Sequence, residues 1–91
     1  MYFEAASTLG RLYRQRGEPA RAIEWFERAT QASAPTADDE HSVLYELGSV
    51  LESAGETARA LAVFLELQAG AGEYRDVSKR IDHLARVQTG G

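Results

Sequence analysis

Residues 17–29 recur in altered form 38 positions further along the chain. The first copy reads GEPARAIEWFERA, and the second, at residues 55–67, reads GETARALAVFLEL. The same offset pairs Leu9–Gly10 with Leu47–Gly48. Recurrence at a fixed spacing of this length is typical of a solenoid, because one short helical unit cannot bury its apolar side alone. The repeat therefore predicts an array of similar units.

Apolar residues recur at intervals of three and four, which predicts amphipathic helices. Gly17 and Gly55 are expected to end helices just past their C-termini, and Pro19 suits a first helical turn. Thr36 followed by Asp39 resembles a capping box with Asp in place of the usual Glu or Gln. No stretch alternates with period two. We predict no strands and five helices, at residues 3–15, 19–32, 37–54, 56–69 and 74–88.

The same spacing identifies the side of each helix that faces inward. The predicted core residues are Phe3, Ala6, Leu9, Gly10, Tyr13, Ala22, Ile23, Phe26, Ala29, Val43, Leu44, Leu47, Gly48, Leu51, Ala60, Leu61, Phe64, Leu67, Val77, Ile81, Leu84 and Ala85.

Composition restricts the classes of partner. The chain has 91 residues, no cysteine and a formal net charge of −4. A net negative charge argues against general binding to nucleic-acid phosphate. We expect no membrane insertion, because no apolar run approaches the roughly 18 residues that a membrane span needs. The N-terminal residues lack the pattern of a secretory signal, and the absence of cysteine fits a reducing compartment, so we expect a cytoplasmic location.

Residue patterns that carry catalytic or metal chemistry are missing from the sequence. His41 and His83 are not at ligand spacing, and neither forms a recognisable motif with a nearby acid. The serines have no nucleophile motif, and no glycine-rich loop follows a strand. We therefore expect no enzymatic activity, no cofactor and no metal site.

With its two aligned units, the sequence resembles the tetratricopeptide repeat family. The first unit carries that pattern at Leu9, Gly10, Tyr13, Gly17, Ala22, Phe26, Ala29 and Pro35, and the second at Leu44, Leu47, Gly48, Leu51, Gly55, Ala60, Phe64 and Leu67. The resemblance implies an all-α, right-handed α-α superhelix forming a single domain over residues 1–91. Its parts are expected to be repeat 1 at 3–34, repeat 2 at 37–70 and a capping helix at 73–89.

The family pattern also assigns roles to some positions, and the sequence departs from it at others. By resemblance, Gly10 and Gly48 let paired helices approach closely, while the aromatic residues fill the wedge between units. Trp25 is expected to pack towards the next unit. The usual first-helix tryptophan is replaced by Ala6, and the period exceeds the usual 34 residues by four. Ile81–Asp82 stands where Leu-Gly is usual, so the last helix is either a cap or half of a degenerate repeat.

The resemblance implies a concave groove, lined by the first helix of each pair, that binds a peptide or partner helix. The positions that face this groove by resemblance are Glu4, Ser7, Thr8, Arg11, Arg14, Ser42, Tyr45, Glu46, Ser49, Glu52, Asp76, Lys79, Arg80, His83 and Arg86. The residues taken as the candidate peptide site are Ser7, Arg11, Arg14, Tyr45, Ser49, Glu52, Lys79, Arg80 and His83. At the positions of the clamp with which some family members grip a C-terminal carboxylate, only Lys79 matches. For Tyr45 the alternative is to cover a neighbouring helix, and for Arg11, Lys79 and Arg80 it is simple solvation.

Two hypotheses of function follow. The first is a non-catalytic module that binds a protein or peptide in the groove. The second is a structural role, as the self-associating end of a longer solenoid. Tyr2 and Phe3 favour the second, because the first helix begins at once and leaves apolar surface uncapped. This hypothesis predicts a homo-oligomer or a chain cut from a larger protein.

Overall fold

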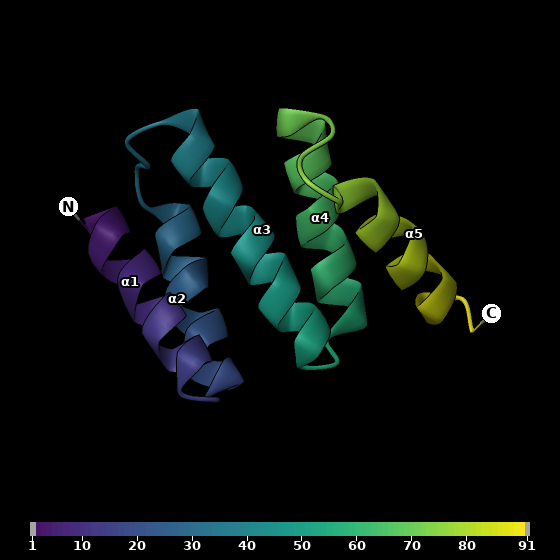
Figure 1. Ribbon diagram of the computed structural model, residues 1–91, viewed down its shortest axis with the longest axis horizontal. Helices are drawn as coiled ribbons and strands as arrows, with labels where there is room; N and C mark the ends of the chain where they lie inside the picture. The colour runs from purple at the N-terminus through teal and green to yellow at the C-terminus, as the bar shows by residue number, and fades with distance from the viewer. Residues whose placement is uncertain (1, 91) are drawn as a thin grey trace.

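Five helices follow one another in a row. The computed structural model describes residues 2–90, and its helices are α1 (Tyr2–Gln15), α2 (Pro19–Gln31), α3 (Ala37–Ser53), α4 (Thr57–Ala71) and α5 (Val77–Gln88). Each helix packs against the next one along the chain, and the molecule extends from α1 at one end to α5 at the other (Figure 1). Residues 2–90 contain no strand. The predicted all-α helical-repeat fold is confirmed.

The row is elongated, measuring 42 × 28 × 18 Å. A single layer of buried side chains runs through it from Phe3 to Leu84. None of the helices within residues 2–90 has the length and apolarity needed to cross a membrane.

The two helix pairs turn in the same way. Gly17 and Gly55 adopt left-handed φ angles of 75° and 82°, which glycine tolerates because it has no Cβ. In the first turn the amide of Glu18 donates to the carbonyl of Tyr13 at 2.9 Å, and in the second Glu56 donates to Leu51 at 2.9 Å. Both are the six-residue closing bonds of a Schellman motif. The 38-residue offset therefore relates backbone geometry as well as sequence.

The start of α3 is capped through Thr36. The amide of Asp39 donates to Thr36 Oγ1 at 3.1 Å, as the sequence predicts. The Asp39 carboxylate accepts a hydrogen bond from the Thr36 hydroxyl, at 3.0 Å. The negative charges of Asp38, Asp39 and Glu40 in the first turn also stabilise α3, because they lie at the positive end of the helix macrodipole.

Gly10 and Gly48 each make room for an aromatic ring. A Cβ on Gly10 would lie 2.7 Å from the ring of Phe26, and one on Gly48 would lie 2.8 Å from the ring of Phe64. Both rings are fully buried. Each phenylalanine thus packs on the glycine of its own helix pair, whereas the expectation had placed the aromatics in the wedge between units. The ring sits where a side chain would stand, so the two helices approach closely.

Two helix boundaries differ from the prediction. α4 continues to Ala71, and α5 begins at Val77, three residues later than expected. Gly72 and Arg75 both have left-handed φ angles, 71° and 51°, which no α-helix accommodates. The intervening turn therefore runs further than the apolar spacing suggests.

Several core assignments also change. Val50, which was not predicted, is 2% exposed, while Leu9, Tyr13, Leu61, Ile81 and Ala85 are only partly buried. Trp25 packs against the core but stays partly exposed, with the guanidinium of Arg28 4.5 Å from its ring centroid. Arg28 also forms an ion pair with Glu24, four residues earlier, at 3.3 Å.

Candidate functional site

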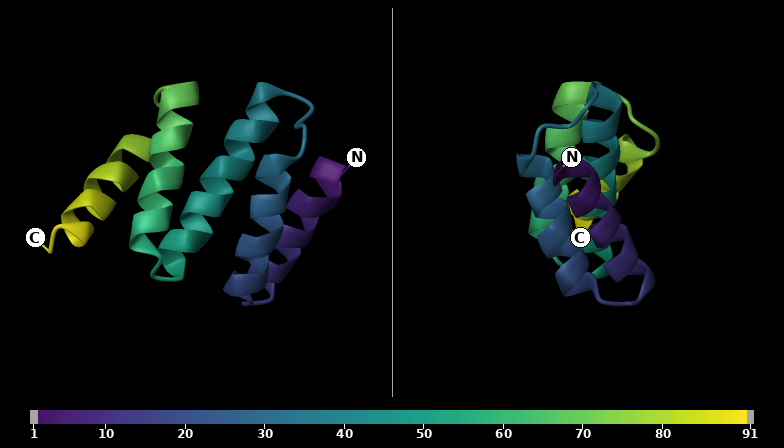
Figure 2. Two further views of the ribbon diagram at one scale, coloured as in Figure 1. Left: turned by 180° about the vertical axis from the view of Figure 1, so that it is seen from behind. Right: turned by 90° about the vertical axis from the view of Figure 1, so that its left-hand side faces the viewer.

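The first helix of each unit contributes to one face of the molecule. α1, α3 and α5 are joined by side-chain contacts between Arg11 and Glu46 and between Glu52 and Arg80. α2 and α4 lie on the opposite side (Figure 2), where Glu27 pairs with Arg59. We call the side made by α1, α3 and α5 the first-helix face. It is the face to which the groove candidates were assigned.

α1 and α3 are held together on this face by a bidentate ion pair. Arg11 Nε donates to Glu46 Oε1 at 2.9 Å, and Arg11 Nη2 donates to Glu46 Oε2 at 2.8 Å. The hydrogen bond to Glu46 raises the pKa of Arg11, against the opposing effect of burial. Bidentate pairing fixes the guanidinium plane as well as its position. Arg11 is therefore a bridge between helices.

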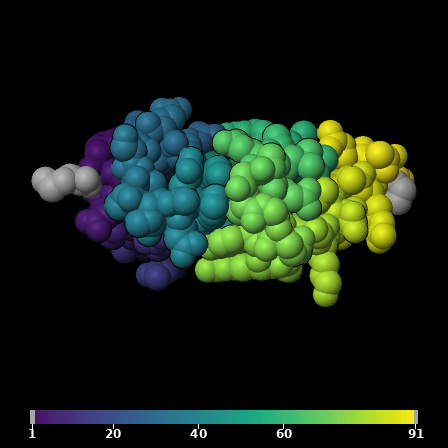
Figure 3. Space-filling view, turned by 90° about the horizontal axis from the view of Figure 1, so that it is seen from above, coloured from purple at the N-terminus to yellow at the C-terminus, as the bar shows by residue number. Residues whose placement is uncertain are grey.

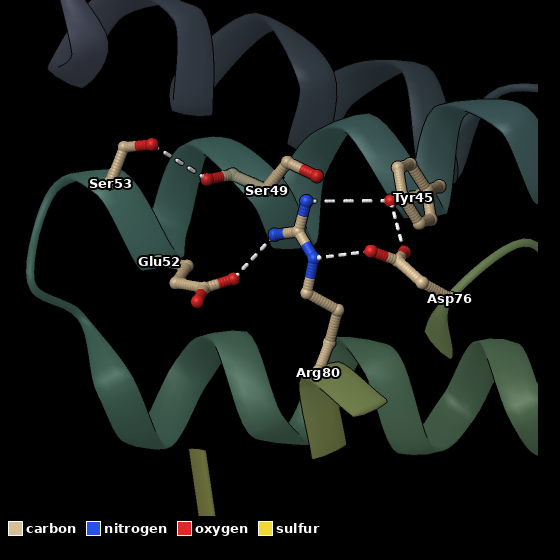
Figure 4. Close-up of polar contacts among 6 residues, drawn as sticks. All are labelled: Tyr45, Ser49, Glu52, Ser53, Asp76 and Arg80. Carbon is tan, nitrogen blue, oxygen red and sulfur yellow. Dashed lines mark hydrogen bonds and ion pairs between the residues drawn. The ribbon is translucent and has the colours of Figure 1, made fainter. Parts of the chain in front are cut away.

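α3 and α5 are joined by a four-residue cluster (Figure 4) of Tyr45, Glu52, Asp76 and Arg80. Arg80 donates from Nη1 to Glu52 Oε1 at 2.6 Å and from Nε to Asp76 Oδ2 at 3.1 Å. Its Nη2 donates to the hydroxyl oxygen of Tyr45 at 3.4 Å, and that hydroxyl donates to Asp76 Oδ1. The guanidinium carbon also lies 5.6 Å from the centroid of the Tyr45 ring. Every polar group in the cluster has a partner within it.

Each protonation state in the cluster supports the others. Burial raises the pKa of Tyr45, and its hydrogen bond to Asp76 adds to the effect, so the phenol stays protonated and donates. That donated bond lowers the pKa of Asp76, with a further contribution from Arg80. Burial lowers the pKa of Arg80, but the bonds to Glu52 and Asp76 outweigh it and the pKa rises. The arrangement anchors α5 on α3.

The predicted groove residues are thus divided between structural and exposed positions. Tyr45, Glu52 and Arg80 belong to the α3–α5 cluster, and Arg11 pairs with Glu46. Ser7 and Ser49 are buried, at 3% and 5% exposure. Arg14, Lys79 and His83 are exposed. The clamp positions Ser7, Arg11, Ser49, Lys79 and His83 do not present a set of free donors, because two are buried and one is paired.

A pocket of about 240 Å³ opens on the first-helix face, between α1 and the start of α3. Its lining residues are Phe3, Glu4, Ser7, Thr8, Arg11, Pro35 and Asp39. Phe3 and Ser7 are buried, whereas Glu4 is exposed and Asp39 is partly exposed. Since Arg11 is neutralised by Glu46, the carboxylates of Glu4 and Asp39 give the pocket an excess of negative charge.

The sequence pointed to Glu4, Ser7, Thr8 and Arg11 as groove residues, but not to Phe3, Pro35 and Asp39. The apolar spacing predicts Phe3 as a core residue. The sequence predicts Asp39 as part of a helix cap, and the structure shows it in that role. Pro35 lines the pocket because the α2–α3 connection passes beside α1, a path that no local pattern shows.

Metal chemistry has no support in the described part of the chain. No group of three or more His, Cys, Asp or Glu side chains within residues 2–90 is arranged to hold a metal ion. Asp38, Asp39 and Glu40 lie in one helical turn and point around the helix.

Comparison with known proteins identifies the first helix pair. Residues 3–33 match the family model described as "Tetratricopeptide repeat". These residues span α1 and α2, including Gly10, Gly17 and Phe26. No curated protein and no solved structure matched the chain.

Proposed function

We propose that this chain, which carries a tetratricopeptide repeat at residues 3–33, binds a protein segment on the first-helix face. Repeats of this family generally mediate protein–protein interaction, and the module is proposed to be non-catalytic. The observation that carries the proposal is the pocket between α1 and α3, because it lies on the face built from first helices. The partner is proposed to insert one side chain there.

The chemistry of the pocket favours a basic side chain. Glu4 and Asp39 supply negative charge from two helices, and Phe3 supplies an apolar floor. The aliphatic stem of a lysine or arginine fits against such a floor while its charged end stays near the carboxylates. A pair of this kind at a partly exposed site contributes up to about 1 kcal/mol.

At the other end of the first-helix face, exposed positive charge comes from Lys79 and Arg75. Lys79 and His83 are exposed on α5, and Arg75 precedes that helix. Arg80, by contrast, is held in the α3–α5 cluster, so it is not proposed as a ligand contact. The favoured segment therefore carries a basic residue near α1 and an acidic residue near α5. Complementary charge of this kind fixes orientation more than it adds affinity.

The test is a titration of the ¹⁵N-labelled chain with synthetic decapeptides that carry Arg at one end and Asp at the other. Amide shifts are expected at Glu4, Thr8, Arg11 and Asp39. The double variant Glu4→Gln, Asp39→Asn keeps the size of both side chains and removes their charge. It should weaken binding about fivefold, which corresponds to roughly 1 kcal/mol.

A matched control is Glu66→Gln, which removes one exposed carboxylate on α4, away from the first-helix face. It should leave the affinity unchanged. Binding that is equally strong in the double variant and the wild type would show that the pocket is not the site. A fall of the same size in the control would mean that net charge alone is being measured.

A further inference from the structure

α1 has a second apolar side, which no other helix within residues 2–90 covers. Tyr2, Ala5, Leu9 and Leu12 follow one another at spacings of three and four, so they form one stripe along the helix. Tyr2 is 55% exposed and Leu12 is 44% exposed. Figure 3 shows α1 at one end of the molecule, opposite α5. We call this stripe the end face.

The repeat shows what normally covers such a stripe. At the offset of 38 residues, Ala5, Leu9 and Leu12 correspond to Val43, Leu47 and Val50 of α3. Those three residues are 0%, 4% and 2% exposed.

The neighbour that buries this stripe of α3 is α2. α3 packs against both α2 and α4. Its Gly48 side faces Phe64 of α4. The stripe of Val43, Leu47 and Val50 lies roughly 100–160° around the helix from Gly48, which leaves α2 as the neighbour on that side. In α3 this side is therefore covered by the second helix of the preceding unit.

α5 repeats the arrangement. An offset of 34 residues from α3 brings Val43 to Val77 and Val50 to Leu84. Val77 and Leu84 are 0% and 2% exposed, and α5 packs on α4. Two of the three first helices thus use this side to bind a preceding second helix. The end face of α1 has the same register and the same chemistry, but its neighbour is missing from residues 2–90.

We propose that the end face binds an amphipathic helix of a partner protein, packed antiparallel on α1 as α2 packs on α3. The helix would present a stripe of small and aliphatic residues to Ala5, Leu9 and Leu12. A shallow hollow of about 540 Å³ beside Ala5 and Leu9 leaves room for a side chain from it. An acidic residue near its N-terminus would face Arg16, which is exposed at the end of the same stripe.

A second copy of this chain fits the end face less well. The surface that complements α1 belongs to a helix of the α2 type, and both such helices already bury their apolar sides, α2 between α1 and α3 and α4 between α3 and α5. Within residues 2–90, Leu65 is the one large hydrophobic side chain that they expose. The hollow shares Glu4 and Thr8 with the proposed pocket, whereas Leu9 lines only the hollow and Asp39 only the pocket, so the amide shifts of Leu9 and Asp39 separate the two sites.

The probe for the test is a synthetic peptide of residues 17–39, which contains α2 and its connection to α3. Added to the ¹⁵N-labelled chain at up to about 1 mM, it should shift the amides of Ala5, Leu9 and Leu12. The affinity is expected to be weak, with a Kd not far below about 1 mM, because so short a helix is only partly formed when it is free in solution. Leu12→Glu should weaken binding at least tenfold. Leu65→Glu is the matched control, since Leu65 is 46% exposed on α4, and it should have no effect.

In a second experiment the peptide is joined covalently to the chain, which compensates for its weak binding as a free peptide. Glu40 is the 38-residue equivalent of Tyr2, so residues 17–39 fused directly ahead of Tyr2 reproduce the native spacing from α2 to α3. Tethering raises the effective concentration to about the millimolar range. The fusion should raise Tm by about 5 °C or more, and Leu12→Glu should abolish the rise while Leu65→Glu preserves it.

Either response supports the proposal if Leu12→Glu removes it and Leu65→Glu does not. The absence of both the amide shifts and the Tm rise overturns it. Shifts confined to Arg11 and Asp39 overturn it as well, because the peptide would then be using the first-helix pocket. Sedimentation of the unmodified chain that shows a dimer sensitive to Leu12→Glu assigns the end face to a second copy, which also overturns the proposal.

Discussion

Replacing Gly48 with alanine tests whether the close packing of α3 on α4 depends on one missing side chain. The new Cβ would lie 2.8 Å from two ring atoms of Phe64, closer than real carbon contacts. The ring is fully buried, so it cannot swing into solvent to relieve the clash.

Two opposing contributions set the size of the effect. Overpacking a filled core typically costs about 1–3 kcal/mol. Alanine in place of glycine within a helix contributes roughly 1 kcal/mol of stability. The expected net change is a loss of about 1 kcal/mol in the free energy of unfolding, or a fall in Tm of about 4–8 °C for a domain of this size.

Gly70→Ala provides the matched control. Gly70 is also helical, and a Cβ there would meet only His41 Nε2, at an ordinary contact distance of 3.8 Å. This variant gains the stability that alanine gives a helix relative to glycine, and its Cβ makes no clash, so its Tm should rise. Urea and thermal unfolding followed by circular dichroism would measure both variants. If Gly48→Ala raised Tm as Gly70→Ala does, the proposed packing of glycine on phenylalanine would be refuted.

Two further variants address the first-helix face. Ser49→Ala should raise the free energy of unfolding by about 1 kcal/mol, because the buried Oγ has no hydrogen-bond partner within residues 2–90; lower stability in urea unfolding would contradict this. Tyr45→Phe should be less stable than the wild type, and this difference should be largest between about pH 4 and pH 10. The pKa of Asp76 is lowered, so its contribution is lost as the pH falls below the ordinary value of 3.8, and the raised pKa of Tyr45 means its contribution is lost only above 10.0. A stability difference that ignores pH would count against the hydrogen bond.

Local patterns in the sequence predict the helices and most of the core. Gly17, Gly55 and the phenylalanines at positions 26 and 64 act through neighbours within one helix pair, so a repeated motif fixes their surroundings. The start of α5 was misplaced because Arg75 adopts a left-handed φ of 51°, a conformation that non-glycine residues rarely show. Apolar spacing carries no sign of such a residue.

The contacts on the first-helix face lie beyond the reach of such patterns. Arg11 meets Glu46 across 35 residues, and Tyr45 meets Asp76 across 31. Neither sequence separation equals the 38-residue offset of the repeat, so no recurring pattern points to these pairs. Arg11 and Tyr45 were assigned to a groove because the family resemblance places these first-helix positions there, and an amphipathic aromatic residue such as Tyr45 is also typical of binding surfaces. Only the rotation of one helix against the next decides whether such residues contact a partner or each other.

α5 makes the two ends of the row chemically different. The side with which α3 receives α4 carries Leu44, Gly48 and Leu51, and the equivalent positions of α5 are Ser78, Asp82 and Ala85. The carboxylate of Asp82 occupies the place where an incoming aromatic ring would need an empty space. Heterologous contacts between copies can extend without limit into filaments only if both ends accept a neighbour. Because Asp82 stands where α3 has Gly48, we expect this side of α5 not to receive a helix in the way that α3 receives α4.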